Sequence, residues 1–402
     1  MEDTPTAGID WSWHRHAVCV VDGRGGRLTE FDVTHTARGL AALVHRLEVA
    51  AVCRVGIERG DGPLVDHLVA SGFEVFVISP RQVKALRLRY QQAGNKDDRF
   101  DAFVLADVLR TDRQRLEPLR PDRPDTVGLR MLVRARKDLV NHRIAVHNQL
   151  LASLQQVFPG AVGLFSQLDR PISLRFMARF PTATKAAWLS ERRLENWLKA
   201  NSYSGRKTPT ELMAHLDDAA PCGLTGAAID ASEVVVTTQV RLLTELRDRI
   251  DDIETRIREA LLAHPDAEIF TSLPRAGVIR AATLLGEIGD CRSRYPDEAS
   301  LAAAAGVAPS TRQSGSFHHV TYRRACDKPL RAAIVDWAQD TPRDNPWAAH
   351  VYQRARQRGC RHPHATRILA RAWIRILWRC WQNRTPYDPA KHGQHQLLTQ
   401  AA

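Results

Sequence analysis

Four carboxylates are spaced along the first hundred residues in a pattern that could hold divalent cations. Asp10 follows a strand-like start, and Glu58 ends the apolar run AVCRVGIE. Asp98 and Asp101 lie three apart at the start of a helix-like segment, where residues at this spacing share one face. Carboxylates that converge from separate segments could bind two Mg²⁺ ions, which would stabilise the attacking and leaving oxygens of a phosphodiester displacement.

Each acid also has a simpler explanation, as a solvated surface charge or a helix N-cap. The position of Glu58 argues against this, because an unpaired carboxylate at the end of an apolar strand is costly to bury. Asp97 competes with Asp98 as a ligand, and only the spacing to Asp101 favours Asp98. The sequence therefore predicts that both the catalytic acids and the metal ligands are Asp10, Glu58, Asp98 and Asp101.

The elements that must position these acids alternate between strand and helix patterns. A strand ending at Asp10 and two more, at 17–21 and 27–33, predict a three-stranded meander. A helix at 36–47, the strand before Glu58, a further helix and strand, and a helix that begins at Asp98 follow. The order βββαβαβα is that of the ribonuclease H fold, so we expect an α/β domain of this kind over residues 1–120.

Two long helices dominate the expected remainder of the chain. They are predicted at about 129–157 and 233–262, and the second keeps heptad spacing from Leu243 to Ala260. We expect them to form coiled coils, with each other or with another protomer, in a connecting region over 121–265. Short helices predict a mostly helical domain over 266–390, and 391–402 reads as a disordered tail.

The composition favours a polyanionic partner. The 402 residues include 57 Lys and Arg against 45 Asp and Glu, a net charge of +12 that favours nucleic acid over an acidic small substrate. No apolar run approaches membrane-spanning length, and the first residues lack the pattern of a signal peptide, so we expect a cytoplasmic protein with no membrane partner. The seven scattered cysteines are expected to be reduced and mostly buried.

Four short motifs carry a family resemblance. GID, GIE and KDDRFDA in the first part, with GVAPSTRQSG far downstream, resemble insertion-sequence transposases of the one-ten family, which are related to the Piv-type DNA invertases. That family pairs a RuvC-like DEDD domain with a C-terminal transposase domain, and the resemblance covers about 7–160 and 266–389. Its K-x-D-x-x-D-A element matches Lys96, Asp98, Asp101 and Ala102, which implies that the two aspartates are metal ligands.

The resemblance also implies a nucleophile. Members of the family use a serine of the C-terminal domain, and the matching residue is Ser314, with Ser310 and Ser316 as near alternatives. A serine that attacks a phosphodiester keeps the bond energy in a covalent link for rejoining. His318 and His319 could move protons there. The residues expected to contact nucleic acid are Lys96, Arg99, Arg312, Arg323, Arg324 and Lys328.

We therefore expect an insertion-sequence DNA transposase or recombinase, Mg²⁺-dependent, that acts as a homodimer or homotetramer on donor and target DNA. The resemblance implies a bridge RNA as guide. The first alternative is a hydrolytic, structure-specific nuclease such as a Holliday junction resolvase, in which water is the nucleophile. The second is a catalytically inactive nucleic-acid-binding protein.

Overall fold

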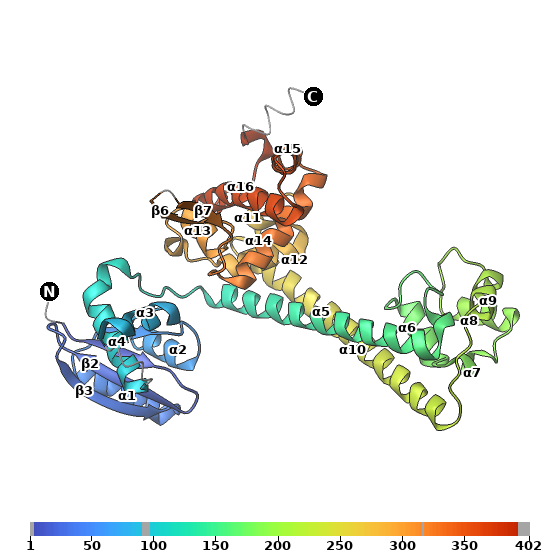
Figure 1. Ribbon diagram of the computed structural model, residues 1–402, viewed down its shortest axis with the longest axis horizontal. Helices are drawn as coiled ribbons and strands as arrows, with labels where there is room; N and C mark the ends of the chain where they lie inside the picture. Colours follow the sequence, from blue (N-terminus) through green and yellow to red (C-terminus); the bar gives the residue numbers. More distant parts are fainter. Residues whose placement is uncertain (1–3, 91–96, 316, 393–402) are drawn as a thin grey trace. The chain divides into compact units, whose positions relative to one another are not determined.

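The computed structural model describes residues 4–90, 97–315 and 317–392, and the chain divides into two compact units, residues 1–121 and 122–402. The first unit is α/β (Figure 1). Its five-stranded sheet has the order β3-β2-β1-β4-β5, with β2 antiparallel to β1 and β3, and β4 parallel to β1 and β5. The strands are β1 Thr6–Asp10, β2 Arg15–Val21, β3 Arg27–Thr34, β4 Arg54–Ile57 and β5 Glu74–Val77.

Helices cover both faces of this sheet. On one face, α1 (Ala37–Val49) and α2 (Pro63–Ala70) share a core with Ile9, Val55 and other apolar strand residues. On the other face, α4 (Asp98–Asp112) packs against Ala17 and Cys19. The basic stretch before the acids, to which the sequence assigned no element, forms an additional helix, α3 (Pro80–Tyr90).

Two glycines let α4 lie directly on the sheet. Gly8 of β1 pairs with Gly56 of β4, so neither strand has a side chain at this position. A Cβ at Gly8 would lie 2.0 Å from the carbonyl oxygen of Ala102 and 2.4 Å from the amide nitrogen of Ala106. Any side chain at Gly8 would therefore push α4 away from β1.

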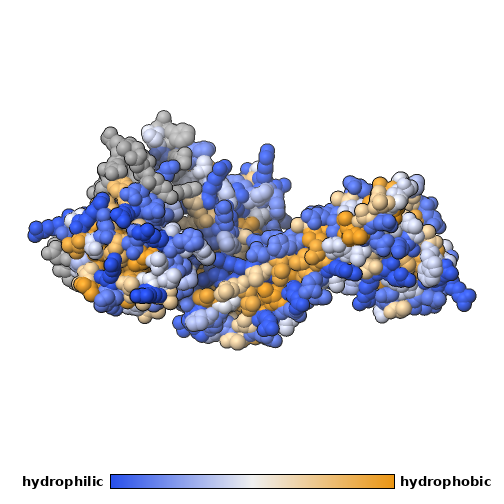
Figure 2. Space-filling model, turned by 90° about the horizontal axis from the view of Figure 1, so that it is seen from below, coloured by the Kyte–Doolittle hydropathy of each residue, from blue (hydrophilic) through white to orange (hydrophobic). Residues whose placement is uncertain are grey.

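Two long antiparallel helices form the frame of the second unit. The first, α5 (Pro124–Val157), and α10 (Ala227–Ala263) pack side by side. The predicted heptad positions Leu243, Ile250 and Ile257 are buried, whereas Met131, Ile144 and Leu242 leave hydrophobic surface exposed. Figure 2 shows a band of hydrophobic residues along these helices.

The two ends of the helix pair enter different cores. The C-terminal end of α5 and the first half of α10 pack with a helical cap, in which Leu154, Phe176 and Val240 are buried. Its helices are α6 Pro171–Arg179, α7 Ala183–Ala186, α8 Glu191–Ala200 and α9 Pro209–Asp217. The opposite ends of the pair join a larger core that includes Leu129, Ile257 and the C-terminal helices.

That larger core contains a row of large apolar side chains at helical spacing. Trp373, Leu377 and Trp381 are fully buried, so they pack in the core. Its helices are α11 Ala267–Thr271, α12 Gly277–Ile288, α13 Glu298–Ala304, α14 Lys328–Asp340, α15 Pro346–Gln357 and α16 His362–Asn383. Between α13 and α14 stands a hairpin of β6 (Ser310–Ser314) and β7 (Phe317–Thr321).

Smaller features complete the comparison with the sequence. Short 3-10 helices lie at Arg113–Arg115, Pro159–Ala161, Arg292–Arg294, Thr341–Arg343 and Pro389–Lys391. The cysteines are free, but the expectation that most are buried was wrong, since only Cys19 is. Of the expected tail, 393–402 lie outside the described residues. Within the described part of the chain, no helix combines the length and apolar character needed to cross a bilayer.

Candidate active site

The strand register places two of the four acids side by side. In the parallel pair of β1 and β4, Ile9 lies opposite Ile57. Asp10 ends β1, and Glu58 is the next residue after β4. Both acids therefore follow a registered pair at the same edge of the sheet, where the carboxyl ends of β1 and β4 meet. Each side chain is partly exposed.

The direction of α4 brings the other two acids to that edge. The Thr6 hydroxyl, near the start of β1, donates a hydrogen bond of 3.0 Å to the Ala106 carbonyl, while Gly8 lies against Ala102. The helix therefore runs antiparallel to β1, and its N-terminus lies at the carboxyl end of that strand. Asp98 and Asp101 occupy the first turn of the helix, so they belong to the same edge as Asp10.

The environments of the aspartates in this helix differ. Asp97 is the N-cap, and its carboxylate accepts a hydrogen bond from the Arg99 amide at 3.2 Å. Asp98 is exposed, whereas Asp101 is only 1% exposed and lies within the packed layer. The capping role of Asp97 accounts for this residue without a ligand role, which supports the choice of Asp98.

The four acids share an edge but do not form a closed ligand cluster. Among the residues that the structure describes, no three His, Cys, Asp or Glu side chains are arranged to hold a metal ion. The donor chemistry nevertheless fits a hard divalent cation, because four carboxylates from two strands and one helix supply only oxygen ligands. The four predicted acids therefore lie at one edge of the sheet and offer suitable oxygen ligands, but their side chains are not arranged as they would be around a bound metal ion.

A loop of aromatic and basic residues borders these acids, and sequence reasoning missed it. Residues 11–16 read WSWHRH; the first four join β1 to β2 directly after Asp10, and Arg15 and His16 begin β2. Trp13 is 68% exposed, and the Arg59 guanidinium, next to Glu58, lies 4.7 Å from the ring centroid of Trp11. The signal that could have found this loop is the alternation of Trp with His and Arg beside a proposed catalytic acid.

The candidate nucleophile stands on the hairpin of the second unit. Ser314 is exposed at the end of β6, and Gly315 follows it with a φ of 54°, in the left-handed region that suits glycine at a turn. Ser314 pairs with Phe317, and side chains alternate along each strand, so His319 shares the face of Ser314 whereas His318 is on the other. Of the alternatives, Ser310 starts β6 and Ser316 lies outside the described residues.

The predicted nucleic-acid contacts fall into three groups. Arg324 and Lys328 are exposed near the hairpin. Two others are engaged, since Arg99 forms an ion pair of 3.1 Å with Asp32 and Arg323 donates a hydrogen bond of 3.5 Å to the Pro309 carbonyl. Lys96 lies outside the described residues, as does the side chain of Arg312.

Arg331, in the first turn of α14, supports the loop after the hairpin. Its guanidinium donates to the Arg323 carbonyl at 2.8 Å and to the Tyr322 hydroxyl, and lies 4.5 Å from the Tyr322 ring centroid. Arg367 of α16 lies 4.6 Å from the same ring. These contacts tie the loop after β7 to the helical core, so Arg331 has a structural role.

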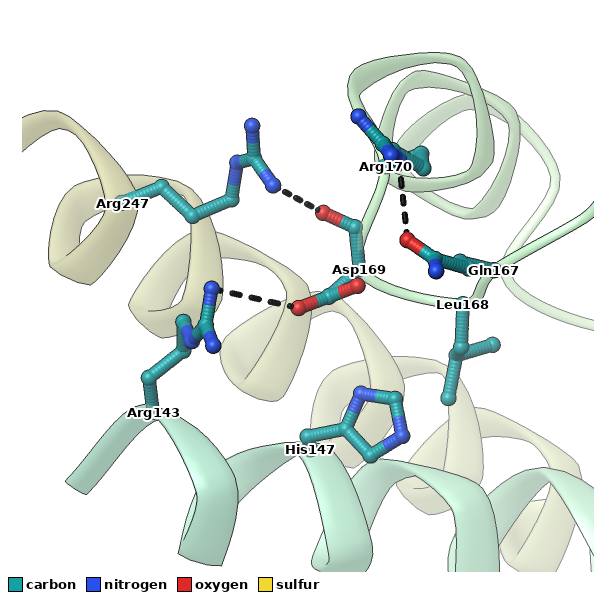
Figure 3. Close-up of a pocket in the computed structure, with 7 residues that line it drawn as sticks. All are labelled: Arg143, His147, Gln167, Leu168, Asp169, Arg170 and Arg247. Carbon is teal, nitrogen blue, oxygen red and sulfur yellow. Dashed lines mark hydrogen bonds and ion pairs between the residues drawn. The ribbon is translucent and has the colours of Figure 1, made fainter. Parts of the chain in front are cut away.

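A basic pocket occurs in the middle region, where the sequence showed no chemistry. It has a volume of about 590 Å³. Figure 3 shows Arg143 of α5 and Arg247 of α10 converging on Asp169. Arg247 donates to the Asp169 carbonyl at 2.7 Å, and Arg143 lies 3.7 Å from the carboxylate. Both arginines therefore hold the loop before α6 against the long helices. The full lining is Arg143, His147, Gln167, Leu168, Asp169, Arg170 and Arg247.

Two transposase family models match this chain. A transposase model of the DEDD type, named for IS110, matches residues 7–159, and the model described as Transposase IS116/IS110/IS902 family matches 267–353. The "Mini-circle putative transposase for IS117" of Streptomyces coelicolor is 33% identical over 399 residues, 96% of each chain.

Other relatives match over a similar length. The IS900 uncharacterized 42 kDa protein of Mycobacterium paratuberculosis is 27% identical over 96% of this chain and 97% of its own. The IS116 uncharacterized 44.8 kDa protein of Streptomyces clavuligerus is 27% identical over 95% and 96%. The chain therefore belongs to the IS116/IS110/IS902 family of transposases and is an enzyme that acts on DNA.

Proposed function

We propose that this transposase cuts and exchanges DNA strands with the four acids as metal ligands and Ser314 as the nucleophile. The observation that carries the proposal is the common edge of Asp10, Glu58, Asp98 and Asp101. Strand order β3-β2-β1-β4-β5, with β2 running opposite to the other four strands, supports a RuvC-like, ribonuclease-H-like assignment for this unit. We also propose that the chain has three domains, at 1–120, 121–265 and 266–390.

We further propose that the four acids bind Mg²⁺, with two ions as the expected number. Asp101 would be a fixed ligand because its helix packs into the sheet, while Asp98 would complete the set from the exposed first position of that helix. Bound Mg²⁺ would supply charge stabilisation for the attacking and leaving oxygens of the displaced phosphodiester. The carboxylates themselves would fix the positions of the bound ions.

In the covalent step, the Ser314 hydroxyl oxygen attacks the phosphorus of a DNA phosphodiester. An O–P bond to serine forms, one P–O bond to deoxyribose breaks, and the leaving oxygen takes up a proton as a free hydroxyl. His319 shares the face of Ser314 in the hairpin and is the residue we assign to accept the serine proton. The reverse attack by a deoxyribose hydroxyl rejoins a strand without an external energy source.

A nicked suicide substrate tests the nucleophile. Cleavage beside a nick releases a short fragment, so the covalent intermediate cannot be reversed and accumulates as a protein–DNA adduct. We expect such an adduct in the presence of Mg²⁺, its loss in Ser314→Ala, and its retention in Ser310→Ala. Robust cleavage without any adduct would overturn the serine mechanism and favour the hydrolytic nuclease, in which water attacks.

The inactive nucleic-acid-binding protein makes a different prediction. If the chain has no catalytic site, Asp98→Asn and Asp101→Asn leave DNA binding, Mg²⁺ binding and the absence of cleavage all unchanged. If the four acids work as proposed, each substitution abolishes Mg²⁺-dependent cleavage. Calorimetric titration with Mg²⁺ compares metal binding by the wild-type chain and both variants, and a cleavage assay on the same proteins distinguishes the two cases.

The partners that we propose are donor and target DNA, a guide RNA and further copies of the chain. DNA is supported by family membership and the net charge of +12. The proposal of a guide RNA rests on the family resemblance. A homodimer or homotetramer, built on coiled-coil pairing of the long helices, is supported by the exposed hydrophobic side chains of α5 and α10. A cytoplasmic location remains a prediction from the sequence.

A further inference from the structure

The loop between β1 and β2 presents an exposed aromatic ring, and neighbouring residues hold this loop in place. The ring centroids of Trp11 and Trp13 are 6.2 Å apart, with the planes at 75°, and Trp13 lies 6.1 Å from His35 at 31°. Trp13 is 68% exposed, whereas Trp337, Trp373 and Trp381 are fully buried. A large apolar ring thus remains in water at a position where neighbouring rings restrict its movement.

Hydrogen bonds below the ring hold the loop in place. The His16 ring is fully buried, and its Nε2 lies 2.9 Å from Nδ1 of His35. The Ser12 hydroxyl donates to the Arg15 carbonyl at 2.5 Å, and the His35 amide donates to the His14 carbonyl at 2.9 Å. The exposed ring is therefore carried by an ordered turn and not by a free end of chain.

The loop is also next to the proposed catalytic acids. Trp11 follows Asp10, and Arg59, whose guanidinium lies 4.7 Å from the Trp11 ring centroid, follows Glu58. Trp13 lies three positions after Asp10, which limits the distance between their Cα atoms to about 11 Å. A nucleotide next to a phosphodiester bound at the acids would have its base within reach of this ring.

The surroundings of Trp13 favour a nucleobase over a protein surface. A protein interface would need a contiguous apolar patch, but the only apolar neighbour of Trp13 among the described ring contacts is Trp11, and Ser12, His14 and His35 lie beside it. Aromatic rings interleaved with basic groups are typical of sites that bind unpaired bases and the adjoining phosphates. Unpaired bases are expected where a strand is opened for cutting.

We propose that Trp13 is a stacking platform for an unpaired DNA base next to the phosphodiester bound at the four acids. The Trp13 ring stacks on the base, and Trp11 and His35 hold the ring in position. Arg59, which is ion-paired with Asp61, packs on the Trp11 ring. This inference rests on the proposed function. It assigns a contact to the loop that neither the acids nor the serine provides.

Binding measurements in EDTA test the platform separately from cleavage. Fluorescence anisotropy would follow the full chain binding a DNA duplex with a short single-stranded gap. Stacking is worth about 1–3 kcal/mol per base, so Trp13→Ala should weaken binding by about 5- to 150-fold. We expect Trp13→Phe to bind within a few-fold of wild type. The matched control is Trp188→Ala, which removes a 55% exposed tryptophan of the second unit and should bind as wild type.

Abasic nucleotides identify the contact directly. At one position of the gap, removing the base should weaken wild-type binding by the same factor as Trp13→Ala and should have no further effect on that variant. The slope of affinity against salt should stay the same, because no phosphate contact is lost. Circular dichroism of Trp13→Ala verifies that the fold persists.

Each other outcome is decisive. Wild-type affinity in Trp13→Ala, or additive effects of the variant and the abasic positions throughout the gap, would overturn the platform while leaving DNA cleavage by the acids intact. Coupling seen only with a single-stranded RNA would overturn the assignment to DNA. Failure of the wild-type chain to bind any DNA would overturn both this inference and the proposed function.

Discussion

Asp101 is 1% exposed on a helix that packs into a sheet, whereas Ser314 is exposed at the turn of a two-stranded hairpin. The acids of the first unit are therefore positioned by a core, through Gly8 and the close approach of α4. The serine is positioned by a hairpin register and by the contacts of Arg331 with the following loop. Substitutions near the acids should thus affect folding as well as chemistry, whereas those near the serine should affect chemistry alone.

The largest expected effect is on catalysis, from Asp101→Asn. Loss of a ligand should remove several kcal/mol of transition-state stabilisation, so the rate of DNA cleavage should fall by about 10³-fold or more. Mg²⁺ should also no longer raise the unfolding temperature of the first unit, because ligand binding to the native state is lost. Single-turnover cleavage and calorimetric unfolding, with and without Mg²⁺, measure the two effects.

A second aspartate in the same helix provides the matched control. Asp107 is 5% exposed and accepts a hydrogen bond of 2.8 Å from Arg110. Asp107→Asn should lower the free energy of unfolding by about 1–3 kcal/mol and leave the cleavage rate unchanged. Ser314→Ala should abolish cleavage without any change in unfolding temperature. Equal losses of cleavage in Asp101→Asn and Asp107→Asn would show that burial in α4, and not metal binding, explains the first result.

The next effect tests the framework under the acids. In Gly8→Ala the new Cβ would meet backbone atoms of α4 at 2.0 and 2.4 Å, so the helix must move. We expect the free energy of unfolding of the first unit to fall by about 3 kcal/mol or more, as in severe overpacking. Urea unfolding followed by circular dichroism measures this change.

Gly128→Ala is the control for that substitution. Gly128 lies inside α5, and a Cβ there would have nothing within 4 Å, so the change should stabilise its helix by about 0.5–1 kcal/mol. A value for Gly8→Ala within 1 kcal/mol of wild type would mean that α4 can shift without cost. The acids would then not be held by the core, and the comparison with the hairpin would fail.

A smaller effect is the pH dependence from the histidine below the Trp13 loop. Burial, and then the neighbouring His35, lower the pKa of His16 from 6.5 to about 4. Between these two values the unfolded chain binds the proton and the native chain does not, so stability is complete above pH 6.5 and declines as the pH falls toward 4. The titration of His16 should lower the free energy of unfolding by about 2 kcal/mol between pH 7 and pH 4.5.

His16→Gln separates this contribution from those of the carboxylates. Thermal unfolding of both proteins across this pH range should show a shallower decline for the variant, whatever its stability at pH 7. Parallel curves would mean that His16 titrates normally in the native state. The β1–β2 loop would then be hydrated, and the buried His16 would not hold the Trp13 ring in position.

The sequence was informative where chemistry and periodicity coincide. Asp10, Glu58, Asp98 and Asp101 were each placed at a strand end or in a helix start, and the structure brings these positions to one edge. The long helices were also predicted, because buried positions such as Leu243, Ile250 and Ile257 recur at heptad spacing. Both predictions rest on local patterns that the fold preserves.

The sequence was uninformative where a residue acts through tertiary contacts. The helix α3 was read only as a basic stretch, because its charges hide the apolar period. Arg323, Arg331 and Arg99 carry the same charge as Arg324, but three of these four are bound to protein groups. Likewise, residue type alone does not show that Trp13 is exposed while Trp373 is buried. Only the contacts of each side chain distinguish these cases.

The smallest effect concerns the cations beside the hairpin. Arg324 and Lys328 are exposed, and each could neutralise one phosphate. Arg324→Ala and Lys328→Ala should each weaken DNA binding by a few-fold, equally for different sequences, and should lower the slope of log affinity against log salt by about one. Anisotropy titrations at several salt concentrations measure both quantities.

Arg99→Ala extends this measurement to the unit that holds the acids. Arg99 forms an ion pair with Asp32, so its removal should leave the salt slope nearly unchanged. If Arg99→Ala lowers the slope as much as Arg324→Ala does, Arg99 leaves Asp32 for a phosphate when DNA binds. Cationic contact would then extend to the edge with the acids, and the two units would differ in how they hold their catalytic groups but not in how they hold DNA.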